Sequence, residues 1–350
     1  MIRDDGRRVL LGMSGGTDSS VSALLLQDMG FEVTGITFRF YEKDGDTEYL
    51  DDALSVCKSI GIPHLVYDAR KLFESKIIRY FISEYLAGKT PVPCIICNNQ
   101  LKWPLLAQIA TENGICHIAT GHYAQMDKKG NSYHIICGKD RDKDQSFFLW
   151  GLTQELMSRI IFPLGTYTKQ TVREIAATRQ LAMAASKKDS IGVCFCPRDY
   201  RSFLRQHVDP EFLQPGWFYN TTGEMIGQHQ GYPFYTIGQR RGLGVQFRYP
   251  VFVKEIIPQS NSIVLDQLSG LYKTEMTLKN YNFFHPDEVF NSQIVTCKIR
   301  YRKQATPSVI EKINENQLRV KFLQPLEAIA PGQAAAFYRQ DCLLGGGIIE

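Results

Sequence analysis

Alternation of strand-like and helix-like segments through the first part of the chain constrains its fold more than any other feature of the sequence. Up to about residue 200, short apolar runs of strand length occur at 9–11, 31–38, 64–67 and 115–120. Helical patterns separate these runs. The first lies between the run at 9–11 and Gly30, and the others cover roughly 50–60, 70–87 and 98–113. A strand followed by a helix, repeated in this way, predicts an α/β fold with a parallel sheet covered by helices on both faces.

The pattern changes after about residue 205, where Gly, Pro, Tyr and Thr become frequent and the apolar runs shorten. Alternating patterns near the end of the chain predict strands at 293–300, 318–322, 334–337 and 347–349, which is typical of a small barrel or sandwich. At 350 residues the chain is also too long for one typical domain. We therefore predict three domains: an α/β domain over 1–205, a small β-containing domain over 206–270 and a β-barrel over 271–350.

The composition excludes several other classes of protein. Hydrophobic residues make up 44% of the chain and charged residues 22%, which argues against disorder, collagen-like repeats and coiled coil. The formal net charge of +4 excludes a protein dominated by a polybasic tail. No apolar run reaches the roughly 18 residues of a transmembrane helix, and the residues before Val9 do not form a secretory signal. Nine cysteines spread over a long chain argue against a secreted disulfide framework, so we expect a cytoplasmic protein without membrane attachment.

The sharpest motif is the string Gly12-Met-Ser-Gly-Gly-Thr-Asp-Ser-Ser20, which follows the first strand and opens a helix. Paired glycines let the backbone approach an anion closely, and the helix start presents N–H groups and partial positive charge to that anion. Ser14, Ser19 and Ser20 add hydroxyl donors, and Asp18 can hold Mg²⁺ beside phosphates. An ordinary glycine turn with a helix cap would explain the paired glycines alone but not the whole string. The string is not a Walker loop, because it does not contain the pattern G-x-x-x-x-G-K-[ST].

The same string resembles the SGGxDS loop of the N-type ATP pyrophosphatases. This resemblance implies an adenine nucleotide α-hydrolase-like domain that binds ATP through its pyrophosphate end. It also implies transfer of AMP to an oxygen atom of the substrate, with pyrophosphate as the second product.

Four cysteines form two close pairs, Cys94-Ile-Ile-Cys97 and Cys194-Phe-Cys196. Their spacing fits metal or iron–sulfur ligation, a dithiol, or a thiol that carries sulfur. A helix predicted to begin near Asn98 would stabilise the thiolate of Cys97 and lower the pKa of that thiol. The remaining cysteines lie in apolar or strand-like runs and are predicted to be small core residues: Cys57, Cys116, Cys137, Cys297 and Cys342.

Eight motifs follow one another along the chain: GMSGGTDSS, TPVPCIICNNQLKW, ATGHYAQ, KDQSFFLW, DSIGVCFC, TIGQRRGLG, IRYR and APGQAAAFY. This ordered set resembles that of the tRNA-specific 2-thiouridylases (tRNA-uridine 2-sulfurtransferases) over nearly the whole chain. The resemblance implies an enzyme that activates the C2 oxygen of the wobble uridine with ATP and replaces it with sulfur carried as a cysteine persulfide. It implies as partners the anticodon arm of tRNA and a protein sulfur donor, either a cysteine desulfurase or a sulfur relay protein.

The resemblance also implies roles for individual residues. Cys97 would be the nucleophile, Cys194 would receive sulfur as a persulfide, and the two would form a reversible disulfide after turnover. ATP contacts are implied at Gly12, Met13, Ser14, Gly15, Gly16, Thr17, Asp18, Ser19, Phe38 and Gly121. From the residues alone, Phe38 is almost as well explained as a core aromatic of its strand.

Contacts with tRNA are implied at Val92, Pro93, Cys94, His122, Lys143, Asp144, Gln145, Arg300, Tyr301 and Gln333. Val92 replaces an Asn that is common in the family, which removes one side-chain hydrogen bond to the target base. The charges around Lys143 alternate in sign and by composition indicate a solvated loop. Lys298, Arg300 and Arg302, with Lys303 beside them, are predicted on a basic strand that tracks RNA phosphates, although lysines on a soluble edge strand would look the same.

Several alternatives remain open. A Cys94–Cys97 dithiol, or an iron–sulfur cluster ligated by Cys94, Cys97 and Cys194, competes with the persulfide route, which needs only two thiols. An ATP pyrophosphatase that adenylates a small molecule would explain the loop but not the reactive cysteines. A non-catalytic RNA-binding protein would explain the barrel but would not need an intact phosphate loop.

Overall fold

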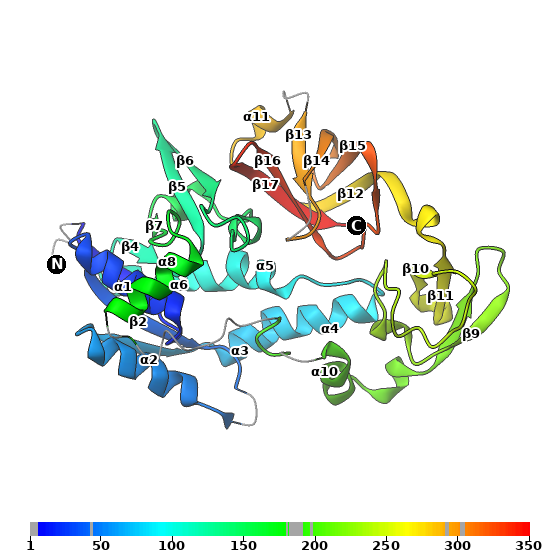
Figure 1. The fold of residues 1–350 in the computed structure, drawn as a ribbon, viewed down its shortest axis with the longest axis horizontal. Helices are drawn as coiled ribbons and strands as arrows, with labels where there is room; N and C mark the ends of the chain where they lie inside the picture. The colour runs from blue at the N-terminus through cyan, green and yellow to red at the C-terminus, as the bar shows by residue number, and fades with distance from the viewer. Residues whose placement is uncertain are drawn as a thin grey trace. The chain divides into compact units, whose positions relative to one another are not determined.

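The computed structural model describes residues 6–42, 45–179, 181, 192–196, 199–290, 294–301 and 305–350. Contacts divide the chain into two compact units, each assembled from separate stretches of sequence. The first unit comprises residues 1–76, 94–195 and 339–344, and the second comprises residues 77–93, 196–338 and 345–350. Figure 1 labels most of the helices and strands of both units.

A parallel sheet forms the centre of the first unit. Its described strands lie in the order β3-β2-β1-β4-β7, and every neighbouring pair is parallel. Their bounds are Arg8–Gly12 for β1, Glu32–Arg39 for β2, His64–Asp68 for β3, His117–Ala119 for β4 and Ile160–Ile161 for β7. The first four strands confirm the predicted runs. Because the chain adds β2 and β3 on one side of β1 and β4 on the other, the strand order reverses between β1 and β4.

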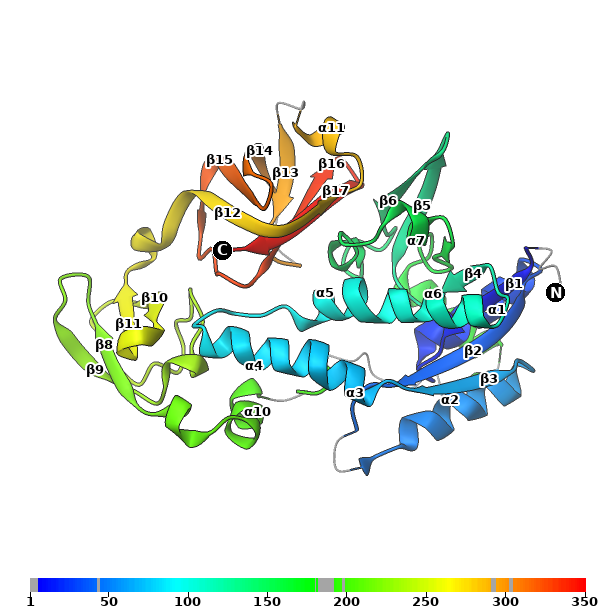
Figure 2. The same ribbon diagram turned by 180° about the vertical axis from the view of Figure 1, so that it is seen from behind.

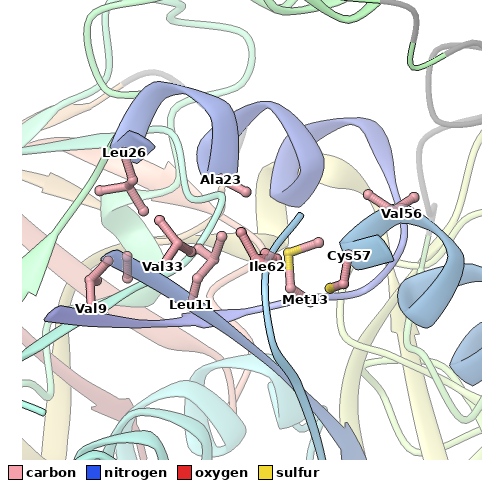
Figure 3. Close-up of a cluster of buried hydrophobic side chains, with 10 residues drawn as sticks. Val9, Leu11, Met13, Ala23, Leu26, Val33, Val56, Cys57 and Ile62 are labelled. Carbon is pink, nitrogen blue, oxygen red and sulfur yellow. The ribbon is translucent and has the colours of Figure 1, made fainter. Parts of the chain in front are cut away.

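Helices α1 (Thr17–Asp28) and α2 (Glu48–Ser59) pack against one face of this sheet. Figure 3 shows the core that they enclose, made by Val9, Leu11, Met13, Ala23, Leu26, Val33, Val56, Cys57 and Ile62. Leu10 points to the other face because strand residues alternate, and it is also fully buried. Helix α6 (Trp103–Glu112) contacts β1 and β4. The predicted α/β layering is therefore confirmed.

The predicted core cysteines divide into two groups. Cys57, Cys137 and Cys297 are buried, as expected for small apolar side chains. Cys342 is only half-buried. Cys116 is exposed, which corrects the prediction, because it lies just before β4 at the amino end of that strand rather than within the buried run.

Two long helical stretches each contain a π-helical turn. One runs through α3 (Arg70–Phe73), η2 (Glu74–Ile78) and α4 (Arg79–Leu86); the other runs through α5 (Pro93–Cys97), η3 (Asn98–Lys102) and α6. The second stretch begins at Pro93 rather than near Asn98, which corrects the predicted start. Proline suits the first turn of a helix, where its missing N–H would have no partner.

Further elements complete the first unit. β5 (Ala124–Lys129) and β6 (Ser132–Cys137) form an antiparallel hairpin. Helix α7 spans Gln154–Met157, and α8 (Lys169–Thr178) packs against α1 through an apolar cluster that includes Val172. Among the described residues, no helix combines the length and the apolar composition needed to cross a membrane.

The second unit contains a sheet whose described strands lie in the order β10-β11-β8-β9. Their bounds are Gly216–Tyr219 for β8, Met225–His229 for β9, Phe252–Ile257 for β10 and Ser262–Asp266 for β11. Helix α10 (Tyr200–His207) precedes β8. This sheet is the small β-containing part predicted in the middle of the chain.

The end of the chain forms a closed barrel in the order β12-β15-β14-β13-β16-β17, with β17 pairing back to β12. The strands span Tyr272–Phe283 (β12), Val295–Lys298 (β13), Thr306–Asn314 (β14), Gln317–Glu327 (β15), Ala334–Arg339 (β16) and Cys342–Ile349 (β17). Helix α11 (Pro286–Phe290) lies between β12 and β13. The predicted barrel is confirmed.

The predicted basic strand is shorter than expected. β13 ends at Lys298, so Arg300 does not share a strand face with it, and Arg302 and Lys303 lie outside the described residues. Lys298 places its ammonium over the Tyr338 ring, 4.6 Å from the centroid. The Arg300 guanidinium donates to the Ala328 carbonyl at 2.9 Å. Arg300 therefore lies two residues beyond the end of β13, where its side chain bonds to the barrel backbone.

Candidate active site

The candidate site lies at the carboxyl ends of β1 and β4, where the strand order reverses. Ligands collect at this point in open parallel sheets because two loops diverge there and leave a crevice. Gly12 ends β1 and leads through the phosphate loop into α1. Ala119 ends β4 and leads into Thr120, Gly121 and His122. The sequence motifs predicted for ATP binding therefore meet at one edge of the sheet.

Hydroxyl groups shape the phosphate loop. The Ser19 hydroxyl accepts from the Ser14 backbone N–H at 3.2 Å and donates to the Gly16 carbonyl at 3.1 Å. Gly15 has a φ of +68°, and a Cβ there would lie 2.8 Å from the Ala53 backbone nitrogen, so only glycine fits. In this described segment no side chain caps α1 at Gly16. The helix start therefore suits an anion, as the sequence predicted.

Gly121 lies directly against this helix start. A Cβ at Gly121 would lie 3.0 Å from the Asp18 carbonyl carbon and 3.1 Å from the Ser19 nitrogen. The loop after β4 can approach α1 this closely only because the residue has no side chain. This packing explains why a glycine occupies a position predicted to contact the nucleotide.

The carboxylate of Asp18 is held by two residues that sequence reasoning did not select. Lys169 donates to both oxygens, at 2.7 and 2.8 Å, and the Tyr123 hydroxyl donates to Oδ1 at 2.8 Å. Lys169 is the first residue of α8 and is only 8% exposed. Tyr123 belongs to the ATGHYAQ motif, which could have signalled it, whereas a lysine at the start of a helix gives no such signal.

Phe38 lies at the carboxyl end of β2 and is half-buried. Its ring stacks on Phe40, with centroids 5.2 Å apart and planes 17° apart, and meets Tyr67 edge-on at 6.3 Å. The predicted contact between Phe38 and the adenosine part of ATP remains a prediction. Its neighbours show that the residue belongs to an aromatic group rather than standing alone.

Three cysteines gather in the first unit, and we call them the thiol cluster: Cys94, Cys97 and Cys194. Cys94 and Cys97 lie one turn apart in α5, at the start of the helical run that continues into α6 (Figure 2). Each of these two thiols interacts electrostatically with Cys194 and with Lys102. The fold thus brings together the two cysteines predicted to exchange sulfur, despite their separation in sequence.

The pKa of the Cys97 thiol is shifted in the direction opposite to the one that the sequence predicted. Burial raises the pKa of Cys97 to about 11, and the Lys102 ammonium only partly opposes this effect. The predicted lowering assumed that Cys97 begins a helix, whereas it lies in the second turn, after Pro93. Cys194 is exposed as a residue, yet the protein around its sulfur and the neighbouring Cys97 and Cys94 raise the pKa of this thiol to about 12. Both thiols are therefore protonated at neutral pH.

Lys102 is placed by the π-helical turn. In η3 the helix widens, so that Lys102, five positions after Cys97, comes to the side of the run that carries the thiols. The Lys102 ammonium lies 3.4 Å from His122 Nε2, and His122 Nδ1 hydrogen-bonds to the Thr120 hydroxyl. Burial and the Lys102 charge hold the pKa of His122 well below its usual range, so the neutral ring accepts from Lys102. Burial also lowers the pKa of Lys102.

The residues of the first unit predicted to contact tRNA are largely engaged within the protein. His122 is buried beside Lys102. Asp144 accepts from the Gly138 and Ser146 backbone N–H groups and is buried, unlike the solvated loop residue that composition indicated. Gln145 exchanges hydrogen bonds with the Tyr123 backbone. Lys143 is half-buried. Their contacts with tRNA remain predictions.

The corresponding residues of the second unit lie on two barrel loops and one connecting segment. The Gln333 amide donates to the Thr90 carbonyl at 2.9 Å, and the Thr90 N–H donates to the Pro331 carbonyl at 2.8 Å. These bonds tie the segment that leads to Val92 and Pro93 to a barrel loop. Tyr301 and Val92 are half-buried. Here, too, contact with tRNA remains a prediction.

Among the described residues, no group of three or more His, Cys, Asp or Glu side chains is arranged to hold a metal ion. Asp18 offers a single carboxylate at the phosphate loop, which fits a Mg²⁺ ion held mainly by nucleotide phosphates.

Comparison with known proteins decides the family. Residues 7–198 match the model described as the tRNA methyl transferase HUP domain, residues 201–267 its PRC-barrel domain and residues 273–349 the aminomethyltransferase beta-barrel domain. The chain is 58% identical to tRNA-specific 2-thiouridylase MnmA 2 of Phocaeicola vulgatus over 99% of both chains. The chain belongs to the tRNA-specific 2-thiouridylase family.

Other members of the family are also similar over their full length. MnmA 1 of Bacteroides fragilis is 53% identical, over 99% of this chain and 98% of its own. MnmA of Carboxydothermus hydrogenoformans is 42% identical over 98% of each chain. Among solved structures, the U34-tRNA thiolase NcsA of Methanococcus maripaludis with its [4Fe-4S] cluster covers 59% of this chain and 66% of its own, at 17% identity and a TM-score of 0.37.

Proposed function

We propose that this protein is a tRNA-uridine 2-sulfurtransferase that thiolates the wobble uridine of tRNA at C2 in an ATP-dependent reaction. The observation that carries the proposal is the presence, in one unit, of an uncapped phosphate loop and a cluster of three interacting thiols. An ATP pyrophosphatase acting on a small molecule would need only the first of these. The products are 2-thiouridine, AMP and pyrophosphate.

The first stage is adenylation. The N–H groups of the phosphate loop and the start of α1 bind the ATP phosphates, and the Ser14 and Ser19 hydroxyls orient them. The uridine C2 oxygen attacks the α-phosphate, and pyrophosphate leaves. Mg²⁺, when bound beside Asp18, neutralises phosphate charge. Lys169 and Tyr123 keep the Asp18 carboxylate in place.

The second stage is sulfur transfer. The terminal sulfur of a Cys194 persulfide attacks C2, and AMP leaves with the former C2 oxygen. The Cys97 thiol gives up its proton to solvent, and the resulting thiolate attacks the Cys194 sulfur. The bond to the transferred sulfur breaks, and its electron pair stays on the 2-thiouridine. A Cys97–Cys194 disulfide forms, and an external thiol reduces it before the next turnover.

The partners follow from this chemistry. The anticodon arm of tRNA would contact the segment around Val92 and the barrel loops that carry Arg300 and Gln333. The target base must leave its stack to expose C2 to both ATP and sulfur. A protein sulfur donor, a cysteine desulfurase or a sulfur relay protein, would load Cys194. Because tRNA is the substrate, we place the reaction in the cytoplasm.

A reconstituted reaction tests the proposal more sharply than a gene deletion, because Bacteroides fragilis and Phocaeicola vulgatus each have more than one named MnmA relative that could mask the loss. An unmodified tRNA transcript with a wobble uridine is incubated with ATP, Mg²⁺, cysteine and a cysteine desulfurase. Mass spectrometry of the nucleosides should show 2-thiouridine, with one AMP released for each. A transcript with cytidine at the wobble position should give neither product. AMP release that depends on a small molecule instead of tRNA would contradict the proposal.

A further inference from the structure

Cys194 and Phe195 are neighbours in sequence but differ in environment. Cys194 is exposed, whereas Phe195 is only 3% exposed. The Phe195 ring meets Phe73 edge-on, with centroids 5.7 Å apart, and meets Tyr41 at 6.1 Å. The residue next to the sulfur carrier is therefore fixed in an aromatic environment within the first unit.

That environment continues as a row of rings. Phe73 stacks on Phe40, with centroids 5.2 Å apart and planes 26° apart, and Phe40 stacks on Phe38 at the same distance. Phe38 lies at the carboxyl end of β2, Phe40 directly follows that strand, and Phe73 ends α3. We call Phe38, Phe40, Phe73 and Phe195 the aromatic row. It joins the predicted adenosine contact to the residue beside Cys194.

We propose that Phe195 is a positioning residue and that the aromatic row couples occupancy of the adenosine position to the position of the Cys194 sulfur. The proposal rests on the proposed function, since it takes Phe38 as an ATP contact and Cys194 as the sulfur carrier. Closely packed rings transmit displacement because they cannot be compressed. A base that binds against Phe38 presses on a ring that already stacks on Phe40, so a shift of Phe38 would continue through Phe40 and Phe73 to Phe195.

This coupling would solve a chemical problem of the reaction. A persulfide reacts readily with other thiols, so its terminal sulfur is wasted if it reaches an empty site. Cys194 must also be accessible to a sulfur donor before the transfer. Cys194 can meet both requirements if the position of the neighbouring Phe195 depends on the nucleotide. The persulfide is then accessible to the donor without ATP and is directed to the uridine only when ATP is bound.

Cys194 alkylation tests the coupling without tRNA or turnover. Iodoacetamide labelling of Cys194 is followed by peptide mass spectrometry, with and without a saturating non-hydrolysable ATP analogue. In the unmodified protein we expect the nucleotide to change the labelling rate by about threefold or more, since it favours one of two arrangements. In Phe40→Leu, which interrupts the row but leaves both ends intact, the rate should no longer respond to the nucleotide.

Controls separate this inference from the proposed function. Phe31→Leu is the matched control, because it removes a ring directly before the same strand β2. Among the ring contacts of the described residues, Phe31 meets only His117, edge-on at 5.7 Å, and so lies outside the aromatic row. This variant should keep the nucleotide response. Binding of the analogue is measured for each variant by calorimetry. If the analogue does not bind the unmodified protein, the proposed function fails. If the analogue binds but Cys194 labelling is unchanged, or if Phe40→Leu responds like the unmodified protein, the coupling is wrong.

A second pair of variants addresses Phe195 itself. Phe195→Leu and Phe195→Ala should load persulfide from inorganic polysulfide as fast as the unmodified protein and should still release AMP. Their yield of 2-thiouridine per AMP should fall in the order Phe, Leu, Ala, because each smaller side chain makes fewer contacts with Phe73 and Tyr41 and holds Cys194 less firmly. A yield that stays constant across the three proteins would show that Phe195 contributes packing alone.

Discussion

At the scale of single residues, Lys102 makes the Cys97 thiol easier to ionise than burial alone would allow. Its ammonium opposes the effect of burial on the Cys97 thiol, and His122 holds it there. The titratable groups that interact with it in the described structure are the three thiols of the cluster and His122. Loss of this charge should therefore raise the pKa of Cys97 further.

We predict that Lys102→Met slows alkylation of Cys97 at pH 8 about tenfold, because removal of an opposite charge nearby raises a thiol pKa by about one unit or more. Peptide-resolved iodoacetamide rates between pH 7 and 10 measure this change. The rate should increase with pH in both proteins, since the thiolate is the reactive form. Lys102→Arg should restore the rate, and Lys129→Met, at an exposed hairpin lysine, should not alter it. Identical pH profiles for Lys102→Met and the unmodified protein would refute this role.

Asp18 joins two functions, because its carboxylate serves the phosphate loop and also neutralises Lys169. Asp18→Ala should abolish ATP–pyrophosphate exchange. It should also lower the free energy of unfolding by about 1–3 kcal/mol, since the buried Lys169 ammonium loses its ion pair with Asp18. Asp18→Asn should lose exchange but unfold closer to the unmodified protein, because the amide still accepts from Tyr123. Exchange at the unmodified rate in either variant would exclude Asp18 from the site.

At the scale of elements, the helical run from Pro93 to Glu112 decides which chemistry is available to the thiol cluster. Cys94 and Cys97 face the same side one turn apart, so Cys94 lies close to the reacting sulfur. The persulfide route does not use Cys94. An iron–sulfur cluster would require it as a third ligand.

Cys94→Ser should therefore keep most of its 2-thiouridine formation, while Cys97→Ser and Cys194→Ser lose it completely. Nucleoside mass spectrometry of the reconstituted reaction gives the yields, and peptide mapping after one turnover should find the Cys97–Cys194 disulfide in iron-free enzyme. Anaerobically purified protein that holds stoichiometric iron, and loses it together with activity in Cys94→Ser, would favour the cluster instead.

The same helical run shows where sequence reasoning succeeds and where it stops. Periodicity predicted the helix because apolar spacing is local, but it missed the start at Pro93 and the π-helical turn that places Lys102. It also gave the wrong sign for the Cys97 pKa. A helix dipole can be inferred from neighbours in sequence, whereas burial depends on residues such as Cys194 that are distant in sequence.

At the scale of the whole molecule, contiguous motifs were sufficient to predict the phosphate loop, the parallel sheet and the barrel. Pairings between remote segments were not predicted. Lys169 on Asp18, Gln333 on Thr90 and Phe195 on Phe73 each join residues far apart in the chain, and each partner is ordinary in its own segment. A single sequence does not show which remote residues will pair, because these contacts form only once the complete fold brings the segments together.

The barrel should contribute to affinity for tRNA through charge. Substitution of Arg300 and Arg302 together by Gln should weaken binding and reduce the slope of log affinity against log salt by about one for each lost phosphate contact. Arg300→Gln should also destabilise the barrel by about 1 kcal/mol, because its bond to Ala328 is lost. Lys321→Gln, at a barrel lysine paired with Glu311, is the matched control and should leave the slope unchanged. Equal slopes for all proteins in filter-binding titrations would show that Arg300 serves the fold alone.

The raised pKa of Cys97 has a consequence for survival of the enzyme between turnovers. Peroxide attacks thiolates, and burial raises the pKa of the Cys97 thiol to about 11, so this thiol is almost entirely protonated at pH 7. In the idle protein Cys97 should therefore resist oxidation to sulfenic acid, even though the enzyme depends on sulfur chemistry. In a cell under oxidative stress, we therefore expect Cys97 to be oxidised mainly in those enzyme molecules in which it is deprotonated during turnover.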